Sequence, residues 1–340
     1  MSSAETQQVR FPASFAFGTS TSSYQVEGAW RSRGMNIWDA FVHQPGKIKG
    51  GDTGDVTTDH FHHFRSDVKL MAQMGLKYYR FSISWARIIP GGTGAISEEG
   101  VRFYSALIDE LLRHGIHPIV TLYHWDLPIG LQIEHDGWLS AHTATAFVQY
   151  AIVCFERFGN RVRHWITINE PNIHAIYGYA RGDHAPGRKV APTREPYKAV
   201  HFMLLAHAYA TATYKRQYAP TQQGLISIAL NSDWREPLTR TRADMDAAQR
   251  SMEFNLGWVA DPLYLGDYPS SMRITLAERL PSFTAEQSSL LLNSTDFFAL
   301  QHYSTMMVSA ADGNVYPSTN FYHAEGVRFH ATRGATKNVL

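Results

Sequence analysis

Short apolar runs alternate with longer amphipathic segments along most of the 340-residue chain. The runs lie at residues 15–21, 78–84, 117–123, 164–170, 225–231 and 296–304. They are almost continuously apolar, which is typical of strands that are buried on both faces of a parallel sheet. Between them lie segments such as EEGVRFYSALIDELLRHGI (98–116), whose apolar residues recur at i, i+3, i+4 and i+7. This period predicts helices that pack on the outside of the sheet.

Polar and aromatic groups, which a core would not select, lie within the predicted strands or just beyond their C-terminal ends. They are Arg80, Tyr123–Asp126, Asn169, Glu170, Asn231, Trp234, His302 and Tyr303. In a (β/α)8 barrel the carboxyl ends of all strands converge on one mouth, which carries the active site. A doubly wound sheet would concentrate such groups at one switch point. The pattern therefore predicts an α/β fold of the (β/α)8 TIM-barrel class.

No Pro/Ser-rich linker or change in composition divides the chain, so residues 11–340 are expected to form a single barrel domain after a flexible N-terminus, residues 1–10. Those first residues, MSSAETQQVR, contain no apolar stretch, and no run of 18 apolar residues occurs anywhere. Neither secretion nor membrane insertion is therefore expected, and the chain is predicted to be cytoplasmic.

The charge balance argues against polyanionic partners. Thirty-one basic side chains nearly cancel 30 acidic ones, which leaves a net charge of +1. This balance argues against a nucleic-acid binder and against a polybasic protein of the membrane surface. The single cysteine, Cys154, cannot form an internal disulfide and is predicted to be a small core residue on an amphipathic helix.

A histidine cluster and a glycine-rich stretch raise the question of cofactors. His60, His62 and His63 lie within one helical turn, but zinc sites need three or four converging ligands. The segment runs directly into the apolar period FRSDVKLMAQMGL, which predicts the start of a helix with ordinary histidines. GGTG (91–94) lacks the strand-turn-helix context of a phosphate cradle, so it is predicted to be a loop. We expect neither a metal nor an organic cofactor.

The stretch HWITINEPN (164–172) ends a run of β-formers on a carboxylate. Pro171 follows Glu170 directly and cannot continue the strand pairing. An amide and an acid, Asn169 and Glu170, are costly at a buried strand end unless they are used. We therefore predict that this strand delivers a working acid to the barrel mouth.

Aromatic side chains beside amides and carboxylates suit sugars, whose C–H faces stack on rings while their hydroxyls form hydrogen bonds. Structural alternatives remain open for three of these residues. Trp125 and Trp234 could be core aromatics, and Arg80 could be an ion-pair partner inside the barrel.

Several segments together resemble glycoside hydrolase family 1, the β-glucosidase family. TINEPN resembles the acid/base motif of that family, and the remaining segments follow in the family's order and spacing. These are FAFGTSTSSYQVEGAW, GDVTTDHFHHFRSDVKLMAQMGLKYYRFSISWARIIP, LYHWDLP and GYARGDHAPG. The resemblance covers residue 11 to about residue 304 and implies a retaining β-glycosidase, specifically a β-glucosidase, with a small glycoside as substrate.

The resemblance also implies a role for each matching residue. Glu170 would be the general acid and base, and Asn169 would hold the 2-hydroxyl of the sugar. The remaining sugar contacts would come from Gln25, His124 and Trp125, with Asn231 toward the leaving group and Tyr303 beside the sugar. Arg80 and Tyr303 would support the nucleophilic carboxylate. Gln301 stands where the family usually has asparagine.

The family's nucleophile segment, T-E-N-G at the end of the seventh strand, has no counterpart here. Only the 37 residues 304–340 follow Tyr303, whereas two further strand-helix units need about 30 residues each. Asp312 and Glu325 are the only acids in this tail, and Glu325 follows no apolar run. About six of eight barrel units are therefore expected, as in a C-terminally truncated family member.

Two functions remain open on sequence alone. One is a retaining β-glucosidase by descent and by most of its site. The other is an inactive truncated fragment or a sugar-binding pseudoenzyme, because no nucleophile is found in the chain. Self-association is expected in either case, since an incomplete barrel exposes strand edges.

Overall fold

A six-stranded parallel sheet forms the centre of the computed structural model, which describes residues 10–12, 14–311 and 324–330. The strand order is β1-β2-β3-β4-β5-β7. Its strands are β1 (Gly18–Ser20), β2 (Tyr78–Ser82), β3 (His117–Tyr123), β4 (His164–Asn169), β5 (Leu225–Asn231) and β7 (Ala299–Gln301). Every neighbouring pair is parallel, so the described part of the chain forms an open segment of a (β/α)8 barrel, as predicted.

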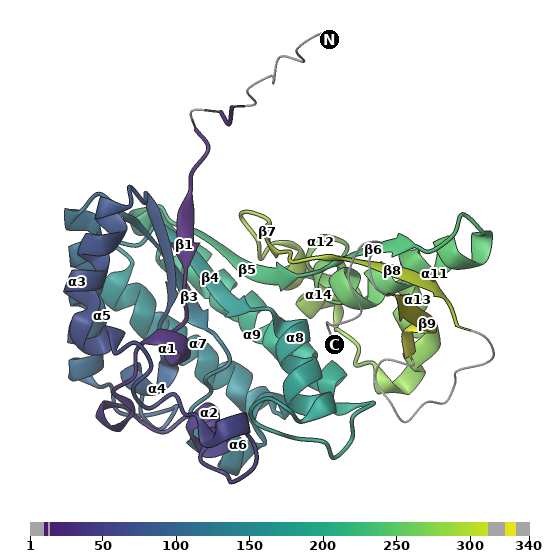
Figure 1. The fold of residues 1–340 in the computed structure, drawn as a ribbon, viewed down its shortest axis with the longest axis horizontal. Coiled ribbons are helices and arrows are strands. Elements are labelled where there is room, and N and C mark those ends of the chain that lie inside the picture. Colours follow the sequence, from purple (N-terminus) through teal and green to yellow (C-terminus); the bar gives the residue numbers. More distant parts are fainter. Residues whose placement is uncertain (1–9, 13, 312–323, 331–340) are drawn as a thin grey trace, which may run out of the picture.

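Helices connect each strand to the next, as parallel pairing requires. The long ones are α3 (His60–Gln73), α5 (Glu98–Arg113), α7 (Ala141–Phe158) and α9 (Glu195–Gln217), and α11 (Arg242–Met252), α12 (Trp258–Tyr264), α13 (Ser270–Leu276) and α14 (Ala285–Leu292) lie between β5 and β7. Shorter helices are α1 (Ser23–Val26), α2 (Ile37–Val42), α4 (Trp85–Ile88), α6 (Ile129–His135), α8 (Pro171–Ala175) and α10 (Ala219–Gln222). Figure 1 shows α3 and α5 near the β1 end of the sheet and α11 to α14 beyond its β5 end.

Local sequence explains where α5 begins. The Ser97 side chain accepts a hydrogen bond from the Gly100 N–H, and Glu98 and Glu99 lie in the first turn, where acidic groups favour the helix dipole. The apolar period predicted for residues 98–116 is buried along this helix, for example at Leu107 and Leu111. The predicted helix is therefore confirmed over most of its length.

The strand predictions are most accurate in the middle of the sheet. β3 and β5 coincide with the runs at 117–123 and 225–231. The terminal strands β1 and β7 have three residues each, whereas runs of seven and nine residues were predicted. Each of these two strands has a strand partner on one side only among the described residues, so fewer pairings extend it.

A second, three-stranded sheet was not predicted. It consists of β6 (Trp234–Pro237), β8 (Thr305–Ala310) and β9 (Val327–His330), in the order β6-β8-β9. β6 and β8 are parallel, and β8 and β9 are antiparallel. Glu325 lies two residues before β9.

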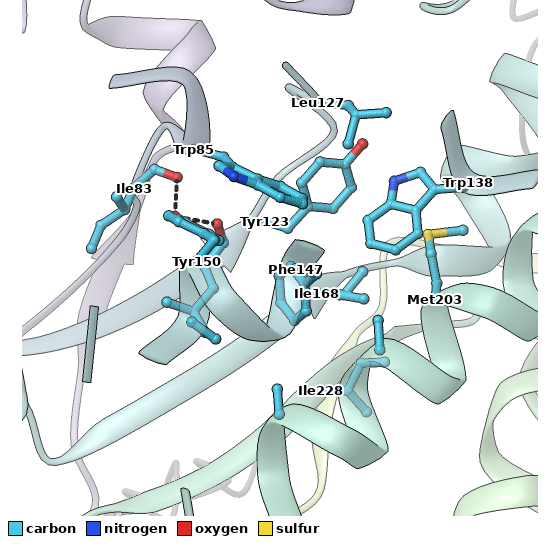
Figure 2. Packing of buried hydrophobic residues seen from close by; sticks show 14 of the residues in the cluster. Ile83, Trp85, Tyr123, Leu127, Trp138, Phe147, Tyr150, Ile168, Met203 and Ile228 are labelled. Atoms are coloured by element: carbon cyan, nitrogen blue, oxygen red, sulfur yellow. Dashed lines mark hydrogen bonds between the residues drawn. The ribbon is translucent and has the colours of Figure 1, made fainter. Parts of the chain in front are cut away.

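Large side chains fill the space between the six-stranded sheet and its helices, as Figure 2 shows. Trp85, Trp138 and Tyr150 are fully buried, and Trp85 stacks on Tyr150 with their ring centroids 5.0 Å apart. The Tyr150 hydroxyl lies 2.8 Å from the Leu122 carbonyl and 3.1 Å from the Ile83 carbonyl, so its polar tip has an acceptor within the apolar surroundings.

The structure also bears on the predictions for Cys154, for the stretch 91–94 and for membrane insertion. Cys154 is buried on α7, as predicted, and burial raises the pKa of its thiol. The stretch 91–94 is a loop. None of the helices in residues 10–12, 14–311 and 324–330 has the length and apolar character that a membrane crossing requires. Residues 1–9 lie outside the described residues, so the flexible N-terminus and the single domain over 11–340 stay predictions.

Candidate active site

The carboxyl ends of the strands meet at one edge of the sheet and border a cavity of about 490 Å³. Strand register places Tyr123 beside Ile168, Asn169 beside Ala229, and Asn231 beside Gln301. The cavity has the size of a small-molecule site. It is lined by Ser20, Thr21, Ser22, Tyr24, Gln25, Trp38, His124, Trp125, Asn169, Glu170, His184, Gln301 and Tyr303.

Glu170 lies directly after β4 and has a positive φ of 45°. α8 begins at the next residue, Pro171, so the chain turns away from the sheet at the carboxylate, as predicted. The Glu170 N–H donates to the Ala229 carbonyl at 2.8 Å, which fixes this turn. The side chain is 5% exposed, and its Oε1 accepts a hydrogen bond from Asn231 Nδ2 at 2.7 Å.

Burial raises the pKa of the Glu170 carboxyl above its ordinary value. The hydrogen bond from Asn231 and the Arg80 charge oppose this shift, and the Asp233 carboxylate adds to it. The net direction is upward, because desolvation penalises the charged form most strongly. Such a carboxyl holds its proton to a higher pH, which suits a general acid.

Arg80 reaches the site through hydrogen bonds with neutral partners. Its Nη2 donates to Asn169 Oδ1 at 2.6 Å, and its Nε donates to Thr121 Oγ1 at 2.8 Å. Burial lowers the pKa of the guanidinium to about 10, so it remains charged near neutral pH. The structural ion pair that the sequence left open is not formed within 4.0 Å among the described residues. Arg80 is therefore a half-buried cation that donates its hydrogen bonds to an amide and a hydroxyl.

His124 and Trp125 follow β3 and frame one wall of the cavity. His124 Nε2 lies 3.1 Å from Asn169 Nδ2, and burial lowers the pKa of this histidine to about 3, so it is neutral. Trp125 has a backbone φ of 70°, which residues other than glycine rarely adopt. Its indole N–H donates to the Asn169 carbonyl at 2.7 Å, and its ring stacks on His174 at 5.7 Å. These two contacts hold the strained tryptophan in place.

The structure brings together most of the residues predicted for the site. Gln25, His124, Trp125, Asn169, Glu170 and Tyr303 line the cavity. Asn231 and Arg80 do not line it, but Asn231 donates a hydrogen bond to Glu170, and Arg80 donates one to Asn169.

Three other residues suggested by the sequence lie apart from the cavity lining. Trp234 is 51% exposed on β6 and donates to Glu236, which excludes the alternative of a core aromatic. The His302 Nδ1 lies 2.9 Å from the Ser232 carbonyl. Glu325 accepts a hydrogen bond from Ser251 Oγ on α11 at 2.8 Å.

Sequence reasoning missed four neighbours of the site. Trp38 and Tyr24 stack at 5.6 Å on one wall, and His184 lines the cavity beside them. No strand precedes these residues directly, so the rule of strand ends does not find them. Asp233 acts on Glu170 electrostatically and accepts a hydrogen bond from the Ser304 N–H at 2.9 Å. Its place two residues beyond Asn231 was the available signal.

The histidine cluster does not form a metal site in the described part of the chain. His60 Nδ1 lies 2.6 Å from Asp67 Oδ2, and His62 and His63 both face Asp59. No group of three or more histidine, cysteine or acidic side chains among the described residues could hold a metal ion. α3 begins at His60, as predicted.

Comparison with known families gives a match over nearly the whole chain. The family model described as "Glycosyl hydrolase family 1" matches residues 7–333. Beta-glucosidase 42 of Arabidopsis thaliana is 46% identical over 324 residues, which are 94% of this chain and 66% of that protein. Beta-glucosidase 6 of Oryza sativa subsp. japonica is 45% identical over 317 residues, 90% of this chain and 61% of that protein.

Solved structures agree with the fold. A rice β-glucosidase mutant in a covalent complex with Glc superposes with a TM-score of 0.92 at 43% identity, over 94% of this chain and 70% of that one. An aphid myrosinase gives a TM-score of 0.92 at 38% identity, over 97% and 74% of the two chains. The chain thus spans less than two thirds of the length of the first curated relatives.

Proposed function

Because this chain belongs to glycosyl hydrolase family 1, we propose that it supplies the acid/base side of a retaining β-glucosidase. The substrate is a small glycoside with a terminal β-linked sugar. The observation that carries this proposal is Glu170, a buried carboxyl with a raised pKa in a sugar-sized cavity beside the Asn169 amide. No metal or organic cofactor takes part in the proposed chemistry.

In this mechanism Glu170 protonates the leaving oxygen and later takes a proton from the attacking water. Asn231 donates to Oε1, so a proton carried on Oε2 leaves that hydrogen bond intact. Asn169 holds the sugar 2-hydroxyl, a contact that strengthens as positive charge develops on the sugar ring. Gln25, His124 and Trp125 bind the remaining hydroxyls and one face of the same sugar.

A retaining enzyme also needs a second carboxylate about 5 to 5.5 Å from the first. Glu170 is the only carboxylate among the described residues that line the cavity. Glu325, the tail acid that could replace a nucleophile, is bonded to Ser251 instead, and Asp312 lies outside the described residues. This supports a second function for the 340-residue chain by itself, namely sugar binding without turnover.

The test of the acid role uses a chimera that provides the second carboxylate. The chimera joins this chain to the last two strand-helix units expected of the family, taken from Beta-glucosidase 42. Glu170→Gln should slow the first chemical step on alkyl β-glucosides by about 10²- to 10⁴-fold. The rate of that step on dinitrophenyl β-glucoside, whose leaving group needs no proton, should fall much less.

The matched control is Glu134→Gln, because the Glu134 side chain is 72% exposed on α6. This variant should hydrolyse both substrates at the unchanged rate. If the pre-steady-state burst rate of Glu170→Gln falls equally for the two substrates, Glu170 is excluded as the acid.

We propose further that the 340-residue chain alone self-associates through the outer edges of β1 and β7. Near β1, the rings of Phe11, Phe15 and Phe17 cluster at 4.4 to 5.1 Å and are 48% to 62% exposed. At the other edge Phe298 and Leu300 are 55% and 43% exposed. Exposed apolar strand edges favour pairing with another copy.

Light scattering after size-exclusion chromatography should therefore give a mass above 38.3 kDa for the chain alone, and an aryl-glucoside assay of the same sample should show no turnover. A monodisperse, active monomer would contradict both statements. The cytoplasmic location stays a prediction.

A further inference from the structure

Gln301, at the end of β7, lies between two residues of the site. Its Nε2 donates to Asn169 Oδ1, and its Oε1 accepts a hydrogen bond from the Tyr303 hydroxyl at 3.0 Å. Both ends of the Gln301 amide are therefore hydrogen-bonded to residues of the site, Asn169 and Tyr303. A glutamine whose donor and acceptor are both engaged has a fixed orientation.

Tyr303 can donate its single proton to only one acceptor at a time. Its oxygen lies 3.0 Å from Gln301 Oε1 but 3.5 Å from Glu170 Oε1. Hydrogen bonds between oxygens are ordinarily 2.5 to about 3.0 Å long. The shorter contact makes Gln301 Oε1 the acceptor of the Tyr303 hydroxyl, which leaves Asn231 as the stronger donor to Glu170.

The opposite end of Gln301 acts on Asn169. Asn169 Oδ1 receives donors from both Gln301 and Arg80, so the acceptor end of this amide is occupied. Its Nδ2 is the end directed toward His124 and the cavity. Asn169 thus presents a donor, not an acceptor, to a bound hydroxyl.

We propose that Gln301 is a positioning residue that directs the Tyr303 hydroxyl away from Glu170 and turns the amide N–H of Asn169 toward the sugar. Its significance for catalysis rests on the acid role proposed for Glu170. The competition of Gln301 and Glu170 for the Tyr303 hydroxyl does not depend on that role. This competition can be measured in the chain without any turnover.

The direction of the effect follows from the groups around Glu170. Arg80 from β2, Asn231 from β5, Asp233 beyond β5 and Tyr303 beyond β7 face its carboxyl. If Gln301 loses its acceptor, the Tyr303 proton turns to Glu170 and stabilises the charged carboxylate. The pKa of Glu170 then falls, because a donor to the charged form favours that form.

The experiment is a ¹³C NMR titration of the full 340-residue chain with labelled glutamate carboxyls. Glu170→Gln assigns the resonance by removing it. Gln301→Met, which keeps the side-chain length but loses both polar groups, should lower the titration midpoint of Glu170 by about 0.5 to 1 pH unit. In the double variant with Tyr303→Phe this decrease should disappear.

Tyr303→Phe alone decides the question if Gln301→Met fails to fold. The proposal predicts that Tyr303→Phe changes the titration midpoint of Glu170 by less than about 0.3 pH unit, because the Tyr303 hydroxyl does not donate to Glu170. A larger rise on Tyr303→Phe, or an unchanged midpoint in folded Gln301→Met, overturns the proposal. Gln217→Met, at an exposed position near the end of α9, is the control and should leave the titration unchanged.

Discussion

The six-stranded sheet and the three-stranded sheet are held in place by different interactions. In the larger sheet, Val120, Leu122, Ile168 and Ile228 are at most 1% exposed and pack between helices and strands. In the smaller sheet Val308 is the strand residue that is fully buried, among the described residues. The larger sheet is therefore stabilised mainly by removal of apolar surface from water.

Polar contacts with α11 hold the smaller sheet. The Ala310 N–H donates to Asp244 Oδ1 at 3.0 Å, and Ser251 Oγ donates to the Glu325 carboxyl at 2.8 Å. Arg250 donates to the carbonyls of Glu325 and Gly326 at 2.6 and 3.0 Å. Contacts of this kind are directional, and those with ionisable groups depend on pH.

The largest expected effect comes from truncating an apolar residue at the centre of the larger sheet. Leu122 on β3 is fully buried, so Leu122→Ala should lower the free energy of unfolding by about 2 to 5 kcal/mol. Leu300→Ala makes the same chemical change on the edge strand β7, where the side chain is 43% exposed, and should cost under about 1 kcal/mol in a sample dilute enough to be monomeric. Urea unfolding followed by circular dichroism measures both.

The pair tests the contrast between centre and edge within one sheet. At concentrations where the chain self-associates through β7, Leu300→Ala should cost more, because a second copy buries the side chain. Equal losses for the two variants in the monomeric sample would contradict the contrast between centre and edge.

This contrast also explains which strands could be predicted from sequence. Strands buried on both faces carry continuous apolar runs, and β3 and β5 were predicted to the residue. β6 has the sequence WREP, whose residues are exposed or half-buried except Arg235, so no apolar run marks it. β9, with the sequence VRFH, pairs with β8. The residue two positions before it, Glu325, is bound by Arg250 of α11, which lies 75 positions away, and local patterns do not record such contacts.

The candidate site was predictable where a strand end carried a polar group. Asn169 and Glu170 were found because β4 places them directly at the mouth. Tyr24, Trp38 and His184 reach the cavity from loops or from short helices, and their positions follow from tertiary packing. The hydrogen bonds of Gln301 could not be predicted, because they depend on side-chain geometry across three elements.

A smaller effect is expected from the buried carboxyl of the three-stranded sheet. Glu325 is 4% exposed, and burial raises its pKa to about 7 despite the hydrogen bond from Ser251 and the charges of Arg235 and Arg250. A carboxyl with a raised pKa in the folded state favours folding while it is protonated. Its contribution is complete below the ordinary value of 4.5 and is lost as the pH rises through about 7.

Hydrogen exchange at the amides of Val327–His330 should report this local loss, because β9 pairs only within the smaller sheet among the described strands. After correction for intrinsic exchange rates, their opening free energy should fall by roughly 1 to 3 kcal/mol between pH 5 and pH 8. Glu325→Gln stays neutral and should remove most of this dependence, whereas Glu134→Gln on exposed α6 should retain it. Protection of β9 that does not change with pH would mean that Glu325 meets water or a cationic partner in solution. The smaller sheet would then rest on its pH-independent contacts, such as those of Arg250 with the backbone.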